Sequence, residues 1–206
     1  MRTAELKEND PPPADDTQLA LMHKIVSRNM RAMELLNALW EYFGGRMKCE
    51  VIRDDGNPSV INYNPCVVNG KEAPDCHLIL RENERLEEAL VHELLHADLW
   101  RRGYPRWFLR TQAESLWNQG RDILNLAEHI VMLPTFKSLG YPEERFVGPS
   151  KPLDEEGRQV LGDLAAMADL LSTPKGFVEE ISAYLQARGI QFEVPCDSAT
   201  GIRHEN

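Results

Sequence analysis

The sequence has few of the features that mark several common classes of protein. Its four cysteines (Cys49, Cys66, Cys76 and Cys196) form no Cys-x-x-Cys pair, so we expect free thiols in a cytoplasmic protein. No apolar run approaches the roughly 20 residues of a membrane span, and the polar N-terminus lacks the apolar core of a signal peptide. A formal net charge of −10 at pH 7 argues against binding to nucleic acid or to anionic membranes.

The composition indicates one globular domain with appendages. The chain has 206 residues, of which 42% are hydrophobic and 27% are charged. We expect a disordered N-terminal tail over residues 1–15, where prolines and dense charge leave little to bury. A single domain is expected over residues 16–190, followed by a loose C-terminal tail over residues 191–206. No internal repeat and no glycine-rich phosphate-binding loop is evident in the sequence.

Hydrophobic periodicity predicts an α+β fold that is mostly helical. Apolar residues at steps of three and four predict helices over residues 16–43, 83–102, 111–133, 153–172 and 174–189. Gly44-Gly45 and Gly103 are expected to end the first two helices, and Pro134 is expected to end the third.

A β region is expected between the first two helices. Two runs predict a hairpin around a turn at residues 55–58, and two shorter strands follow; these segments are residues 47–53, 59–64, 66–68 and 76–80. Pro65 is expected to break the run, and the pattern leaves open whether Cys66 meets Cys76 across a turn. The sequence therefore predicts a small antiparallel sheet directly before the second helix.

The strongest chemical signal is the pattern His-Glu-x-x-His, formed by His92, Glu93 and His96. Four residues are close to one helical turn, so the two imidazoles point the same way and can hold one Zn²⁺. Glu93 lies beside them, where its carboxylate can act as a general base on a water. The helix is apolar on most sides and is expected to be buried, so its polar groups need partners that a metal can supply. A chance match and a purely structural zinc site are the alternatives.

A catalytic zinc needs a third protein ligand. The helix expected over residues 111–133 is its natural source, because helices joined by a short loop pack against each other. Glu128 lies on the border of the apolar face, whereas His129 lies nearly opposite the centre of that face. The sequence favours Glu128 as the metal ligand, with His129 close behind and Glu114 and Asp122 as weaker candidates. Asn125 is one turn earlier and can orient either of the two favoured residues.

This arrangement resembles the zincin metallopeptidases, and more narrowly the small gluzincin-type domains of the ImmA/IrrE kind. The resemblance covers residues 47–134, and its specific part is the segment VHELLH from Val91 to His96. A weaker part is the segment NLAEHIVMLP of residues 125–134, which is similar to the close of the second helix in that family. The Glu-His pair at 128–129 stands where the family carries a Glu-x-x-Ala-Asn signature.

The resemblance implies a zincin-like fold and zinc-dependent hydrolysis of a protein or peptide substrate. His92, His96 and Glu128 or His129 would bind the zinc, and Glu93 would be the general base. It also implies that the strand at residues 76–80 is an edge strand that can pair with an extended substrate. Tyr104 or Tyr141 would assist the oxyanion. The alternative is a catalytically idle zinc-binding or protein-interaction module, and the oligomeric state stays open.

Overall fold

The computed structural model describes residues 16–53, 59–68, 71–82, 85–146 and 154–194, which form an α+β fold. The expected N-terminal tail, the turn at residues 55–58 and residues 195–206 of the expected C-terminal tail lie outside the described residues. The chain groups into two compact units, Met1–Leu94 and Leu95–Asn206. Helix α3 (Leu86–Arg101) begins in the first unit and ends in the second.

Two helices, α1 (Asp16–Ile25) and α2 (Met30–Tyr42), stand where one long helix was predicted. The chain breaks between them because Asn29 starts a new helix: its side chain accepts a hydrogen bond from the Ala32 backbone N–H at 3.1 Å. Apolar spacing alone did not show this break, since both helices bury residues of the same stripe. The predicted stop after the second helix is confirmed, because Gly44 and Gly45 adopt positive φ angles of 58° and 74°.

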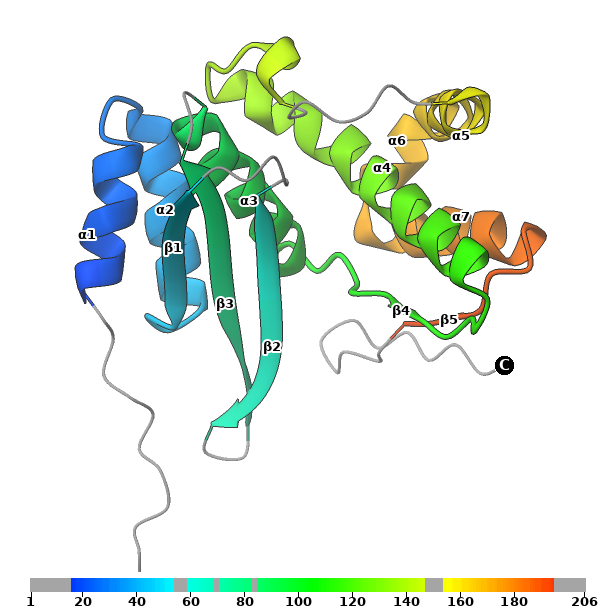
Figure 1. The fold of residues 1–206 in the computed structure, drawn as a ribbon, viewed down its shortest axis with the longest axis horizontal. Coiled ribbons are helices and arrows are strands. Elements are labelled where there is room, and N and C mark those ends of the chain that lie inside the picture. Colours follow the sequence, from blue (N-terminus) through cyan, green and yellow to red (C-terminus); the bar gives the residue numbers. More distant parts are fainter. Residues whose placement is uncertain (1–15, 54–58, 69–70, 83–84, 147–153, 195–206) are drawn as a thin grey trace, which may run out of the picture. The chain divides into compact units, whose positions relative to one another are not determined.

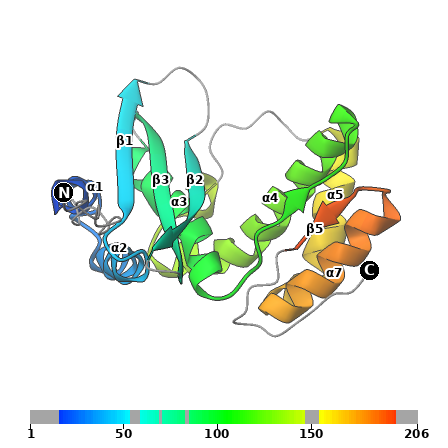
Figure 2. The same cartoon turned by 90° about the horizontal axis from the view of Figure 1, so that it is seen from below.

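The sheet of the first unit is mixed, so the predicted antiparallel sheet is wrong. Its strand order is β1-β3-β2, with β1 at Met47–Arg53, β2 at Val60–Val68 and β3 at Lys71–Glu82 (Figures 1 and 2). β1 pairs parallel with β3, and β2 pairs antiparallel with β3. The predicted hairpin of β1 with β2 is therefore also wrong. Alternating side chains identify strands but do not say which strands pair.

The strand that precedes α3 is the central strand of this sheet. Residues 76–80 of β3 pair with β1 on one side, and Cys76 to Ile79 also pair with β2 on the other. The prediction of an edge strand that receives a substrate here is wrong, because the backbone groups on both sides of this segment are already paired. Buried Cys76, Leu78 and Leu80 place this strand in the core.

Pro65 does not break the chain but lies within β2, opposite Pro74 of β3. Proline has no backbone N–H, so it removes a hydrogen bond of the sheet only where that N–H would point to a paired strand. The outer side of an edge strand such as β2 has no paired strand, so a proline is tolerated there. The register also sets Cys66 opposite Ala73, so this pairing does not join Cys66 to Cys76. Cys49 and Cys76 are free, buried thiols, and burial together with the neighbouring Glu50 charge raises the pKa of Cys49 to about 11.

The second unit is built around helix α4 (Glu114–Ser138), which contacts α5 (Glu155–Ala166), α6 (Ala168–Leu171) and α7 (Pro174–Ala187). A short 3-10 helix (Glu143–Arg145) follows α4. A two-stranded sheet pairs β4 (Phe108–Leu109) with β5 (Phe192–Glu193), so part of the tail predicted to be loose is a strand. The helix predicted over residues 153–172 is interrupted at Met167.

α4 continues for a turn past the point where the sequence predicted its end. Pro134 lies inside the helix and costs it one backbone hydrogen bond. Phe136, in the extra turn, is fully buried and lies 5.0 Å from the rings of both Tyr141 and Phe146. Burial of this side chain acts against the cost of the proline, since a fully buried Phe contributes about 1.5–3 kcal/mol.

The motif helix α3 is buried along most of its length, as predicted. Three of its buried residues are polar: Glu93, His96 and Asp98. The apolar buried residues are Leu90, Val91, Leu94, Leu95, Ala97 and Leu99. The helix ends where expected, because Gly103 has φ +88° and the Tyr104 backbone N–H closes the end by donating to the Leu99 carbonyl. Among the described residues, no helix has the length and apolar character needed to cross a membrane.

Candidate metal centre

Helix α3 holds both histidines of the motif in the expected geometry. His92 and His96 are four residues apart in one unbroken helix, so they share a face. His96 is buried, with 8% of its surface exposed, and Glu93 is buried, with 5% exposed. The apolar residues around them form the core, so the motif lies within a protein interior and not on an exposed helix face.

A third histidine joins this pair from α4. His92, His96 and His129 each offer one ring nitrogen, and the three nitrogen atoms lie within 4.8 Å of one another. Nitrogen ligands of a tetrahedral zinc, at about 2.0–2.1 Å from the metal, lie about 3.4 Å apart. The three nitrogen atoms are therefore close enough to approach one metal ion. Of the two residues that the sequence favoured as third ligand, His129 is the one in this group.

Glu128 has a different place, behind His96. Its Oε2 atom lies 2.7 Å from His96 Nδ1, and the side chains are 21% and 9% exposed. A neutral His96 that donates its Nδ1–H to this carboxylate presents Nε2 to a metal. Carboxylates in this position fix the ring orientation and the tautomer of a metal-binding histidine, and they raise its basicity.

The reversal between Glu128 and His129 follows from the length of α4. His129, Met132 and Phe136 are spaced three and four residues apart, and both Met132 and Phe136 are buried. Ending the helix before Pro134 removes Phe136 from its apolar face and leaves His129 outside that face. Phe136, an aromatic residue two positions after Pro134, was the sequence signal for this. A helix that continues to Phe136 has His129 on the same side as this buried ring.

His129 is suited to metal binding because it stays neutral. Burial, and secondarily the charge of His96, lower the pKa of His129 to about 3. Its ring packs against Phe146, with ring centroids 5.2 Å apart. A neutral imidazole is the form that binds a metal, so His129 pays little in deprotonation at neutral pH.

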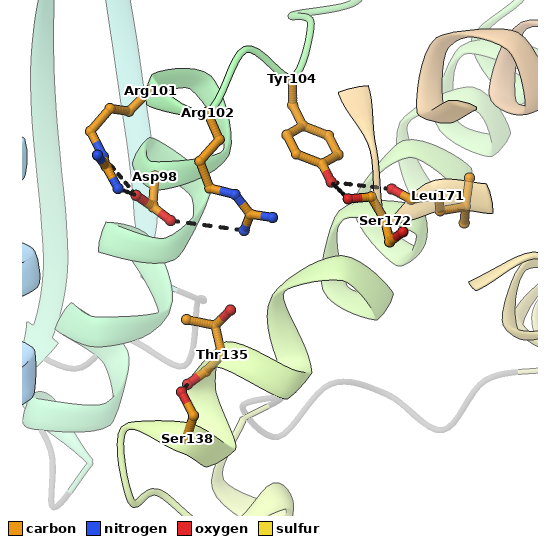
Figure 3. Close-up of polar contacts among 8 residues, drawn as sticks. All are labelled: Asp98, Arg101, Arg102, Tyr104, Thr135, Ser138, Leu171 and Ser172. Carbon is orange, nitrogen blue, oxygen red and sulfur yellow. Dashed lines mark hydrogen bonds and ion pairs between the residues drawn. The ribbon is translucent and has the colours of Figure 1, made fainter. Parts of the chain in front are cut away.

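The tyrosines expected to assist the oxyanion have other contacts. The buried Tyr104 hydroxyl donates to the carbonyls of Leu171 at 3.3 Å and Ser172 at 2.6 Å, at the end of α6 (Figure 3). Tyr141 packs against Phe136. The Tyr104 hydroxyl therefore connects the chain after α3 to α6. Asn125, expected to orient a ligand, is exposed on α4 and lines a pocket together with Glu128.

The donor set of the cluster defines the class of ion that it fits. Three imidazoles suit zinc and also other first-row transition metals such as copper, iron and nickel. Calcium and magnesium prefer oxygen ligands and fit this set poorly. The site is therefore a candidate transition-metal centre with three histidine ligands, His92, His96 and His129.

No family model, curated protein or solved structure matches this chain. Its function therefore has to be argued from the geometry of its own residues.

Proposed function

We propose that this protein is a zinc-dependent metallopeptidase in which His92, His96 and His129 bind the zinc and Glu93 is the general base. The observation that supports this most directly is the meeting of three histidine nitrogens within 4.8 Å of one another, with Glu93 next to one of them on α3. The substrate would be a protein or peptide, as the resemblance of the His-Glu-x-x-His segment to the zincins implies.

Each side chain has a separate task in this proposal. Bound zinc supplies a Lewis acid that polarises the substrate carbonyl and makes a water more acidic. Glu93 would take the proton of the attacking water and deliver it to the leaving amine. Glu128 holds His96 in the tautomer that exposes Nε2.

The presence of a buried carboxylate within the motif favours chemistry over a purely structural site. Glu93 is buried beside the histidines in sequence, and three histidines do not need it in order to bind zinc. An idle zinc-binding module is the second candidate. It is favoured by the burial of His96, since an enclosed site is typical of structural zinc.

The test begins with the metal content of the purified full-length chain, measured by elemental analysis before and after incubation with zinc at neutral pH. We expect one zinc per chain. A chain that takes up no zinc would contradict the metal centre.

The second step separates the two candidates. Glu93→Gln should retain zinc but lose hydrolysis of a mixed peptide library by a factor on the order of 10²–10⁴. Glu87→Gln, on the first turn of the same helix, is the matched control and should retain both. If Glu93→Gln cleaved peptides as fast as the unchanged protein, the assigned role of Glu93 would be wrong. If the unchanged, zinc-loaded protein cleaved nothing in the library, the idle module would be favoured.

A further inference from the structure

A pocket of about 430 Å³ lies in the second unit, between α4 and the segment around β4. Its wall on α4 includes Trp117, Arg121, Leu124 and Glu128. These residues are spaced four, three and four positions apart, so they form one continuous stripe of the helix. The volume falls within the range of about 300–1,000 Å³ that is typical of small-ligand sites.

Two exposed aromatic residues in this pocket each have an arginine over the ring. Phe108 and Trp117 are both 41% exposed, which is high for large apolar side chains. The Arg110 guanidinium lies 5.9 Å from the centre of the Phe108 ring, and the Arg121 guanidinium lies 5.4 Å from that of Trp117. The pocket therefore offers apolar surface and positive charge side by side, in a chain with a net charge of −10.

Both arginines form solvent-exposed ion pairs with acidic residues in the part of the chain that the structure describes. Arg110 lies 2.5 Å from Glu193 and Arg121 lies 3.1 Å from Asp122, and every one of the four side chains is more than half exposed. Ion pairs of this kind contribute little to stability, so a carboxylate of a ligand can replace either acidic partner at small cost. The planar guanidinium also favours two parallel hydrogen bonds to a carboxylate.

One residue of the pocket, Glu128, also contacts the candidate metal centre. Glu128 lines the pocket and is hydrogen-bonded to His96 at 2.7 Å. Arg121 and Glu128 are seven residues apart, which is about 10 Å along a helix axis. A ligand that reaches from the arginines to Glu128 is therefore longer than one amino acid, since an extended chain advances about 3.3–3.6 Å per residue.

We infer that this pocket binds the C-terminal end of a peptide whose last residue has a large apolar side chain. The side chain packs against Phe108 and Trp117, and the terminal carboxylate binds Arg121 and Arg110. A C-terminal residue carries its carboxylate and its side chain on the same α-carbon, which matches the adjacency of guanidinium and ring in the pocket. The assignment of this peptide as the substrate rests on the proposed function, whereas the binding itself does not.

The test is isothermal titration calorimetry on the full-length protein. The protein carries Glu93→Gln, so that no bound peptide is cut. The probe is N-acetyl-Ala-Phe, used as the free acid and as the amide. We expect the acid to bind with a Kd on the order of 1 mM or below, as suits a ligand of this size. The amide should bind at least fivefold more weakly. Equal binding of the two forms, or no binding of the acid, would overturn the inference.

A third peptide separates two sources of the carboxylate. N-acetyl-Glu-Phe amide has an acidic side chain but no terminal carboxylate, and we expect it to bind as weakly as the first amide. If it bound as tightly as the free acid, the pocket would recognise an acidic side chain, and the assignment to a C-terminus would be wrong.

Two further variants locate the binding. Arg121→Gln should weaken binding of the free acid by about fivefold or more, because it removes a charged partner of the carboxylate. Arg158→Gln on α5 is the matched control: Arg158 is similarly exposed, at 60%, and is paired with Glu155 at 2.6 Å. It should leave binding unchanged, and equal losses in both variants would contradict the proposed place. These readouts need no hydrolysis, so their failure would leave the proposed function standing, and a lack of activity would leave the binding result standing.

Discussion

Two buried polar side chains of helix α3, Asp98 and His96, find their partners in different ways. Asp98 of α3 is buried, and its partners come from the same helix and the residue after it: Arg101 lies 2.7 Å away and Arg102 lies 3.9 Å away (Figure 3). His96, half a turn earlier, is bonded instead to Glu128 of α4. The charge of Asp98 is therefore paired by residues next to it in sequence, whereas His96 has its partner on a second helix.

This contrast shows which part of the site is local. α3 is buried on most sides and fixes His92, Glu93 and His96 by helical spacing alone. The buried residues of α4 include Ile123 and Ala127 on one side and Met132 and Phe136 nearer its C-terminus, and His129 is three residues before Met132. The candidate metal centre needs a residue from each helix, since His129 of α4 lies in one group with His92 and His96 of α3.

The largest expected effect comes from removing His129, the candidate ligand on α4. His129→Ala should lower zinc affinity by a factor on the order of 10³, because one of three protein ligands is lost. Zinc affinity would be measured by competition with a chelator of known Kd, and circular dichroism would check that the helices remain. His23→Ala is the control, since His23 is bonded to Asn37 at 2.7 Å, on the neighbouring helix α2, and is not in the cluster. Unchanged affinity in His129→Ala would show that α3 binds metal without this residue.

A smaller effect is expected from Glu128→Gln. This change keeps the size of the side chain but removes the charge that supports His96 Nδ1. Loss of such a partner typically lowers metal affinity by about 10- to 100-fold. The same chelator competition measures it, and the effect should be clearly smaller than that of His129→Ala. The reverse order would make Glu128 the third ligand and His129 its neighbour.

The smallest effect is expected at a carboxylate outside both helices. Asp163 of α5 accepts hydrogen bonds from Tyr184 and Gln159, each at 2.7 Å, and Arg188 lies 3.7 Å away. The hydrogen bonds from Tyr184 and Gln159 hold the pKa of Asp163 below its ordinary value of 3.8. A lowered pKa in the folded state means that the ionised group stabilises the fold above its unfolded pKa. That contribution is lost as pH falls through the folded pKa.

Asp163→Asn should therefore lower Tm slightly at pH 7, and its difference from the unchanged protein should shrink as the pH falls below the ordinary pKa of 3.8. Thermal unfolding followed by circular dichroism at pH 7 and below that pKa measures this. A difference that stayed constant with pH would mean that the charge of Asp163 does not matter. Zinc binding should be unchanged in Asp163→Asn, because Asp163 is not in the histidine cluster.

Several elements could be predicted from sequence because their signals are local. The motif helix, its burial and its end at Gly103 follow from residues within a few turns of one another. The start of α7 is similar, because Thr173 caps the helix and Pro174 occupies its first position. The break at Asn29 was missed, because an apolar stripe continues across it although the backbone does not.

The sequence by itself determined one half of the candidate site: helical periodicity places His92 and His96 on one face in any fold that keeps α3 helical. Tertiary structure decided the other half. It brings His129 into one group with His92 and His96, on a helix α4 that continues past Pro134 to the buried Phe136. Tertiary structure also decided that β3 is the central strand, because the packing of the whole sheet, and not the strand's own residues, selects its neighbours.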